Sequence, residues 1–372
     1  MAASKAPLEA IFGKHRPRDR RLAEVGADGE ALLKEVLANP TDDRPRLVYA
    51  DHLQQRGDPR GEFIAVQCAH AKLDPKDPAA LRLATRAAAL LEEHKRQWVD
   101  PFMGDRYTTV IGGRKYTRTS PSLWDFHRGF VRTATVSAES FPALSAGLFS
   151  REPVQRVRLT NRGLEDVLKA PGLEKLRELD LSNMRLKNAS LALFACKRFE
   201  SLEVLELQKC GLGMKGAKAM TQADPKCWPR LRQLGVAENA LRDAALREFA
   251  RAPLLAQVRN LNLFNNKFGV AGWTALVMSP FLERLEVLDV NQATIGSEGA
   301  RALATSKLRK TLRVLNLRFV QLGDDGLAEL VKANLSALRE LRVPCNGLTA
   351  RSEKLLEGPW CKQLDVLEVS ES

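Results

Sequence analysis

The sequence lacks long hydrophobic runs. It has no apolar stretch of the roughly 18 residues that a transmembrane helix needs, and its N-terminus, MAASKAPLEAIFGKHRPRDRR, has no hydrophobic signal core. A membrane-spanning segment and a secretory leader are therefore not expected. We expect a soluble, cytoplasmic protein without a membrane partner.

Residue patterns typical of catalysis and metal binding are also missing. The five histidines form no H-E-x-x-H pair, and the six cysteines form no C-x-x-C pair. The sequence contains no Walker phosphate loop, G-x-S-x-G elbow or dinucleotide fingerprint. We therefore expect reduced thiols, no metal, no cofactor and no enzymatic activity.

The sequence does contain one pattern, L-x-x-L-x-L-x-x-N-x-L or a close variant, repeated along its last two thirds. Partial copies begin at Val131 and Leu364, and successive copies start 22 to 29 residues apart. The full copies start at Val154, Leu176, Leu202, Leu231, Val258, Leu285, Leu312 and Leu338. This period and pattern indicate leucine-rich repeats. No single repeat can bury its apolar residues alone, so stacked repeats must form a common core.

One repeat from the middle of the array, LEVLDVNQATIGSEGARALATSKL, predicts a strand, a turn and a helix. Asp289 alternates with the inward residues Leu288 and Val290, which places Asp289 on the exposed face of the strand. The helix is expected over Glu298–Ala304, with Ser297 as its N-cap. The segments GMKGAKAM and GDDGLAELV predict equivalent helices in other repeats.

A ladder position follows each strand. Asn239, Asn266 and Asn346 occupy it in three repeats, where a buried carboxamide can bond the backbone of adjacent coils. Other residue types occupy it elsewhere, so the ladder is expected to be irregular: Arg162, Met184, Cys210, Ala293 and Val320. The strand, turn and helix within about 27 residues resemble the ribonuclease-inhibitor and Ran-GTPase-activator class of leucine-rich repeat. This resemblance covers residues 131–372 and implies an α/β solenoid, a horseshoe, behind an N-terminal helical cap.

The segment before the repeats has its own pattern. The run RLVYADHLQQRGDPRGEFI, residues 46–64, predicts two helices separated by Gly57, with Asp58 as N-cap and Pro59 as first residue of the second helix. It resembles the repeat-companion domain, a small helical module fused to repeat arrays in myxobacterial and planctomycete proteins. The family usually has Trp where this chain has His52. The resemblance implies a bacterial protein but no known activity.

Four segments are therefore expected: a basic tail at 1–24, a helical repeat-companion domain at 25–99, a connector at 100–130 and the solenoid at 131–372. The connector is expected to form a hairpin around Gly112-Gly113 and to pack Trp124 and Phe126 over the first coil. Such a cap is needed because the first coil otherwise exposes its hydrophobic end.

The helical module holds one polar cluster that has two interpretations. It consists of ion pairs that fix the helices together, or it is a docking face for a partner. Its members are Arg46, Tyr49, Asp51, Arg60 and Glu62. An Asp beside an Arg is too common to indicate catalysis.

Alignment of the predicted strands gives two columns of side chains on the concave face. The central column contains Asp180 and Glu206 in the early coils, and Asn262, Asp289 and Arg342 later. The next column contains Phe264 and Arg318, with Phe319 beside it. Aromatic and Arg side chains are typical anchors of protein interfaces. The alternative is that Phe264 and Phe319 only cover the edges of neighbouring coils.

The formal net charge is +13, and its densest basic run, KHRPRDRR, lies at 14–21. This run is either a solvated tail or a contact for nucleic acid or an acidic partner, through Lys14–Arg21. The leading functional hypothesis is a non-enzymatic scaffold, monomeric or weakly dimeric, that binds another protein in the concavity. A GTPase regulator and a nucleic-acid-associated protein are the alternatives, and fold alone does not decide between them.

Overall fold

A computed structural model describes residues 27–99, 107–111, 114–118 and 123–370. The predicted basic tail at 1–24 lies outside these residues. The chain divides into two compact units, Met1–Glu92 and Glu93–Ser372, and the division falls within one long helix. The four segments predicted from the sequence remain predictions.

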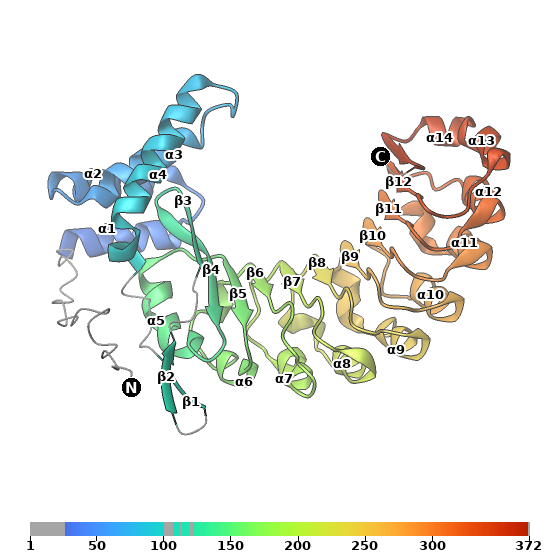
Figure 1. The fold of residues 1–372 in the computed structure, drawn as a ribbon, viewed down its shortest axis with the longest axis horizontal. Helices are drawn as coiled ribbons and strands as arrows, with labels where there is room; N and C mark the ends of the chain where they lie inside the picture. Colours follow the sequence, from blue (N-terminus) through green and yellow to red (C-terminus); the bar gives the residue numbers. More distant parts are fainter. Residues whose placement is uncertain (1–26, 100–106, 112–113, 119–122, 371–372) are drawn as a thin grey trace, which may run out of the picture. The chain divides into compact units, whose positions relative to one another are not determined.

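The first unit is helical. Its second helix packs against the first and the third. The helices are α1 (Ala27–Ala38), α2 (Asp43–Gln55), α3 (Pro59–His70) and α4 (Pro78–Val99), the last of which continues into the second unit (Figure 1). The turn between α2 and α3 is the predicted one: Gly57 has φ 71°, and the Asp58 carboxylate accepts the backbone N–H of Arg60 at 2.8 Å.

Helices α2 and α3 approach each other closely at Gly61. A Cβ at this position would lie 2.5 Å from the carbonyl oxygen of Ala50 and 2.8 Å from the backbone nitrogen of Gln54. Only a residue without a side chain permits this approach. The second glycine of the RGDPRGEFI segment, Gly61, is therefore required by packing.

Two antiparallel pairs precede the repeats. Strands β1 (Tyr107–Ile111) and β2 (Arg114–Arg118) pair on either side of residues 112–113, which confirms the predicted hairpin. Strand β3 (Leu123–His127) pairs with the first solenoid strand and so forms an edge of the main sheet. Trp124 and Phe126 on β3 are buried, and the Phe126 ring lies 6.1 Å from that of Trp98.

The main sheet has eleven strands in sequence order from β3 to β13, and all pairs after β3–β4 are parallel. It lines the inner side of the curved second unit (Figure 1). Its solenoid strands are β4 (Phe130–Ser137), β5 (Arg156–Thr160), β6 (Glu178–Asp180), β7 (Val204–Glu206), β8 (Gln233–Gly235), β9 (Asn260–Asn262), β10 (Val287–Asp289), β11 (Val314–Asn316), β12 (Glu340–Arg342) and β13 (Val366–Glu368).

A helix follows most strands and lies on the outer side of the curve (Figure 1). The helices are α5 (Phe141–Arg151), α6 (Leu164–Val167), α7 (Ala189–Ala195), α8 (Gly213–Thr221), α9 (Asp243–Phe249), α10 (Val270–Val277), α11 (Gly296–Thr305), α12 (Gly323–Ala333), α13 (Ala350–Leu356) and α14 (Pro359–Lys362). Short 3-10 turns precede some strands: η3 (Leu173–Lys175), η4 (Pro225–Cys227), η5 (Pro253–Gln257) and η6 (Lys307–Lys310). The predicted helices are confirmed, but Ser297 lies inside α11 and is not its N-cap.

Neighbouring coils also cap each other's helices. The Asp243 carboxylate accepts the backbone N–H groups of Gly269 and Gly272 at 2.7 and 2.9 Å, at the start of the next helix. Asp324, four residues after its ladder position like Asp243, accepts the backbone N–H of Thr349 at 2.9 Å. The first-turn N–H groups of a helix, which have no partner within their own helix, are thus satisfied by the preceding coil.

The core lies between sheet and helices, and the predicted asparagine ladder runs through it. Asn239 is buried and accepts the backbone N–H of Cys210 at 2.9 Å, while its amide donates to the carbonyl of Leu207 at 2.7 Å. Asn266 and Asn346 make equivalent bonds. Cys210 takes the same position, and its thiol donates to the carbonyl of Leu181. Burial raises the pKa of this thiol to about 12.

Candidate functional site on the concave face

The register of the parallel strands confirms the predicted central column. Consecutive strands pair Arg158 with Asp180, Asp180 with Glu206, and Glu206 with Gly235. The column then continues through Asn262, Asp289, Asn316, Arg342 and Glu368. These side chains therefore lie on one face, roughly 4.8 Å apart from coil to coil.

Four column members bond to their own backbone; Asp180 and Asn316 are buried and Asp289 is half-buried, whereas Asn262 is exposed. The Asp180 carboxylate, on a residue only 8% exposed, accepts the N–H of the residue two positions later at 2.9 Å. Asn262, Asp289 and Asn316 do the same at 3.0, 3.0 and 3.2 Å. Asn316 also donates to Asp289 at 3.0 Å. Short Asx side chains commonly make this i to i+2 bond. The sequence prediction treated Asp180, Asn262 and Asp289 as surface groups and did not include these backbone bonds, although the recurrence of Asx after the strand leucine was the available signal.

The early coils form a charged network around Glu206. Arg158 lies 3.5 Å from Asp180, so Asp180 is paired. Glu206 accepts the Gln233 amide at 2.9 Å and lies over Gly235, where a Cβ would collide with its carboxylate. Burial raises the pKa of Glu206, and the negative charge of Asp180 adds to this effect, whereas the bond from Gln233 lowers the pKa. Glu206 has no salt bridge within the part of the chain that the structure describes.

The two predicted arginine anchors are held by acidic residues of the same face. Arg318 pairs with Glu368, which lies two coils further along. Arg342 lies 2.7 Å from Glu340 and 3.5 Å from Glu368. Their guanidinium groups are therefore partly neutralised, and a partner must compete with these pairs or bind to the paired arrangement.

Phe319 stands at an unusual backbone position. In each of eight successive coils the residue before the ladder position has φ between 52° and 68°. These eight residues are Asn161, Asn183, Lys209, Glu238, Asn265, Gln292, Phe319 and Cys345. Asn tolerates this left-handed conformation, whereas a bulky residue there is an outlier. The Phe319 side chain is also 46% exposed, so burial does not explain why an aromatic residue occupies this position.

Phe264, the other predicted aromatic anchor, is half-buried and lies two coils before Phe319. Two coils correspond to roughly 10 Å along the sheet. The aromatic pair is therefore close enough for one partner segment to contact both rings.

Comparison with known proteins agrees with the repeat pattern. A family model described as Leucine Rich repeat matches residues 284–304 and 310–331. These segments hold β10–α11 and β11–α12, one strand and one helix for each match. The chain is built from leucine-rich repeats.

Two solved structures resemble the chain at low similarity. The chain is 13% identical to a chain of the yeast Rad7–Elc1 complex, with a TM-score of 0.39, covering 62% of this chain and 64% of that one. It is 16% identical to a chain of the TLR13–ssRNA13 complex, with a TM-score of 0.33, covering 63% of this chain and 37% of that one. The match thus spans less than two thirds of either structure. No curated protein sequence matches the chain.

The predicted cluster on the helical module does not form a single surface. Arg46 and Tyr49 are buried at 2% and 5% exposure, and Arg46 donates to the carbonyl of Pro40 at 2.7 Å. Asp51 is exposed. Arg60 is partly buried. Glu62 on α3 accepts two bonds from Arg86 on α4, at 2.6 and 2.7 Å. This pair links α3 to α4 through Arg86, which is not a member of the predicted cluster.

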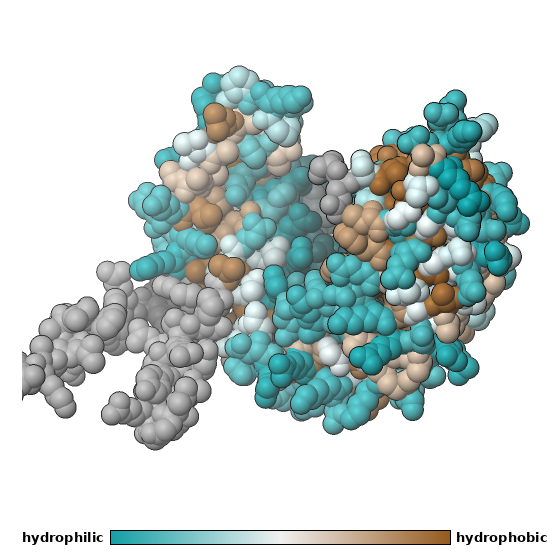
Figure 2. All heavy atoms as spheres, turned by 45° about the vertical axis from the view of Figure 1, so that its right-hand side comes forward, coloured by the Kyte–Doolittle hydropathy of each residue, from teal (hydrophilic) through white to brown (hydrophobic). Residues whose placement is uncertain are grey.

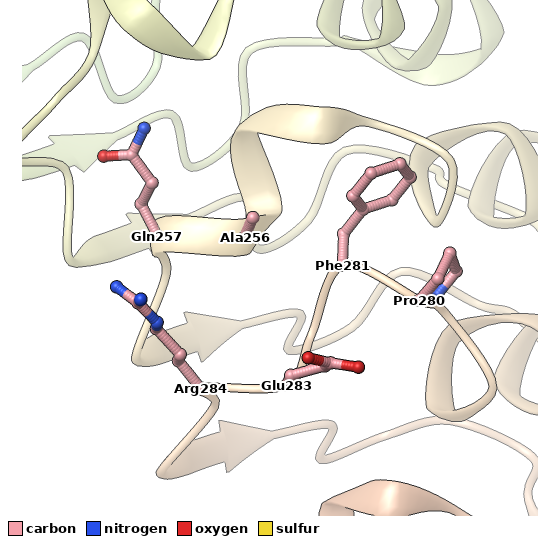
Figure 3. A pocket seen from close by; sticks show the side chains of 6 residues that line it. All are labelled: Ala256, Gln257, Pro280, Phe281, Glu283 and Arg284. Carbon is pink, nitrogen blue, oxygen red and sulfur yellow. The ribbon is translucent and has the colours of Figure 1, made fainter.

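The described residues contain no group of three or more His, Cys, Asp or Glu side chains arranged to hold a metal ion. None of their helices is both long and apolar enough to cross a membrane. A cavity of about 360 Å³ lies on the flank of the solenoid between η5 and the segment before β10, lined by Ala256, Gln257, Pro280, Phe281, Glu283 and Arg284 (Figure 3).

Hydrophobic residues gather over the C-terminal coils in the face that Figure 2 shows, whereas much of the remaining solenoid surface in that view is hydrophilic. Val366 on β13 is 39% exposed, and Leu367 is only half-buried, although the equivalent Leu341 and Leu315 are fully buried. The last coil therefore has a less complete core than the coils before it.

Proposed function

We propose that this protein is a non-enzymatic scaffold that binds another protein on the concave face of its solenoid, over the coils that carry Phe264 and Phe319. The observation that carries the proposal is Phe319. A bulky aromatic residue there, exposed and in a left-handed conformation, lowers stability without a packing gain that offsets the strain. Strained residues of this kind are concentrated at binding and active sites.

The surroundings of Phe319 suit a protein partner. Aromatic residues and arginine are enriched at the centre of protein interfaces. Arg318 and Arg342, with their acidic partners Glu340 and Glu368, supply a polar surround that is nearly neutral in charge. Such a mixed surface favours a partner with an apolar side chain flanked by polar groups over a uniformly charged polymer.

Comparative affinity capture tests this proposal. The full-length wild-type chain, a double variant Phe264→Ala/Phe319→Ala and a control Leu191→Ala are immobilised in parallel. Leu191 is 49% exposed on α7, on the outer side, so the control also removes an exposed apolar side chain. We expect a protein that wild type and control retain and the double variant loses. Equal recovery on all three would place the interface elsewhere.

The finer assignments from the sequence belong to the same proposal. We assign the repeats to the ribonuclease-inhibitor and Ran-GTPase-activator class because helices of seven to eleven residues recur within repeats of about 27 residues, as in α9, α11 and α12. We assign residues 25–99 to a bacterial repeat-companion domain, supported by the packing requirement at Gly61. A cytoplasmic location and a monomeric or weakly dimeric state complete the proposal.

A further inference from the structure

A strip of positive charge follows the edge of the sheet at which the strands begin. The residue directly before each of β8 to β12 forms its centre: Arg232, Arg259, Glu286, Arg313 and Arg339. Backbone bonds join these residues coil to coil. The carbonyl of Arg232 accepts the N–H of Arg259, and that of Arg313 accepts the N–H of Arg339, both at 2.8 Å. The backbones of these residues therefore form a regular row, in which four residues are arginines and Glu286 is acidic.

Loops before the same strands widen this row into a surface, which we call the basic rim. It contains ten exposed basic residues: Lys226, Arg230, Arg232, Arg259, Arg284, Lys307, Arg309, Lys310, Arg313 and Arg339. Three acidic residues accompany them: Asp224, Glu283 and Glu286. Among the described residues, only Arg259 and Lys307 of the ten form salt bridges, with Glu286 and Glu283. The remaining eight are not neutralised by a neighbouring carboxylate, so the rim attracts anions.

The cavity of about 360 Å³ opens within this rim, and Arg284 belongs to both. Gln257 and Arg284 extend along one side of it, and Phe281 and Pro280 lie on the other (Figure 3). The Gln257 amide nitrogen donates to the carbonyl of Pro225 at 2.8 Å, which fixes the amide and leaves its oxygen as an acceptor. An aromatic ring, a fixed acceptor and a guanidinium together suit a nucleobase next to its phosphate.

We propose that the basic rim binds single-stranded nucleic acid, with phosphates along the arginine row and one base in the cavity beside Phe281. A base in a duplex is stacked and paired and does not enter such a cavity without being flipped out. An acidic polypeptide would use the cations but has no heterocycle for the cavity. The rim is separate from the concave residues around Phe319, so the proposal does not depend on the protein-binding site.

The test measures fluorescence anisotropy of labelled 20-nucleotide single strands, one DNA and one RNA of the same mixed sequence, with the full-length chain over a range of salt concentrations. The rim variant carries Arg232→Gln, Arg313→Gln and Arg339→Gln. A matched control carries Lys218→Gln, Arg247→Gln and Lys354→Gln, which removes equal charge from exposed positions on α8, α9 and α13. Both sets replace surface residues and are checked by thermal melting.

We expect the rim variant to bind single strands on the order of 100-fold more weakly at 0.1 M salt, and the slope of log Kd against log salt to fall by about 2. These values follow from three lost phosphate contacts at about 0.7 each. The control variant should retain its slope and lose less than about 3-fold. Equal weakening by both triple variants would show that only net charge matters and would overturn the proposal.

Two further measurements separate the alternatives. Phe281→Leu should weaken binding of a normal strand but not of an abasic strand, because only the former places a base in the cavity. Equal effects on both strands would remove the base-binding part of the proposal. A poly-glutamate chain of the same charge should compete poorly. If it competes as well as the nucleic acids, the rim is a site for acidic polypeptides and the nucleic-acid proposal is wrong.

The basic tail is tested in the same assay with Arg16→Gln, Arg18→Gln, Arg20→Gln and Arg21→Gln together. Binding that survives this change but not the rim change assigns the site to the rim. If the tail variant loses binding and the rim variant keeps it, the proposal is contradicted. The DNA and RNA strands identify which of the two polymers the rim prefers, since only RNA offers a 2′-hydroxyl.

Discussion

Replacement of Asn266 by Ala tests the asparagine ladder that joins the coils. The Asn266 carbonyl oxygen accepts the backbone N–H groups of Asn239 and Leu241 at 2.9 and 3.2 Å. Its amide donates to the carbonyls of Val236 and Leu263, both at 2.9 Å. The residue has no exposed surface, so water cannot replace these bonds without opening the coil.

The expected loss of stability is large. The substitution leaves two buried N–H groups without acceptors, and each such group costs about 1–3 kcal/mol. Loss of the two carbonyl contacts adds to this, although Val236 keeps a second donor in Asn239. We expect Asn266→Ala to lower the free energy of unfolding by roughly 3–6 kcal/mol. Alanine is sterically acceptable at this position, because Ala293 occupies the equivalent ladder position in the next coil.

Guanidinium unfolding followed by far-UV circular dichroism measures this loss, with Cys210→Ala as the matched control. The Cys210 side chain occupies the same ladder position but donates only weak thiol bonds. Its truncation should cost about 1 kcal/mol. If Asn266→Ala costs no more than the cysteine control, the ladder does not stabilise the solenoid as described.

Three further predictions follow from individual contacts. Phe319→Asn should be more stable than Phe319→Ala by about 0.5–1 kcal/mol in urea unfolding, because both remove the ring but only Asn suits the left-handed backbone; equal stability would argue against strain. Hydrogen bonds from Ser352 and Thr349 lower the pKa of Asp324 to about 2 from an ordinary value of 3.8. Its carboxylate therefore stabilises the fold fully above about pH 4, and the stability difference from Asp324→Asn should shrink as pH falls towards 2; a difference independent of pH would contradict this. Gly61→Ala should lower the melting temperature of the full chain, since a Cβ would collide with the backbone of α2, and an unchanged melting curve would show that the helices are not closely packed there.

The fold was predictable because each repeat encodes the same local structure. Leucines spaced for a short strand, a ladder position and a following helix recur from copy to copy and define the core, so irregular ladder residues such as Ala293 change little. Ser297 was wrongly predicted as an N-cap because helix α11 begins two residues before the predicted start, at Gly296, whose φ of 61° permits the turn. Helix ends depend on such turn geometry more than on side-chain preference.

The site was predictable only in part. The column that contains Asp180, Asn262 and Asp289 follows from strand alternation, and the register confirms it. The bond that each of these side chains makes to its own backbone two residues on was missed, although the Asx residue that recurs after the strand leucine indicates it. The pairing of Arg318 with Glu368 depends on side chains two coils apart, and no local pattern encodes it.

The most direct test of the central claim is the dissociation constant of a captured protein partner for the Phe319→Asn variant. This substitution installs the residue that Asn161, Asn183 and Asn265 supply in other coils, so it removes the ring without disturbing the backbone. The account predicts a loss of about 1–3 kcal/mol, roughly 5- to 150-fold in Kd, with Leu191→Ala unchanged. A partner that binds Phe319→Asn and Phe264→Ala as tightly as the wild type would contradict it.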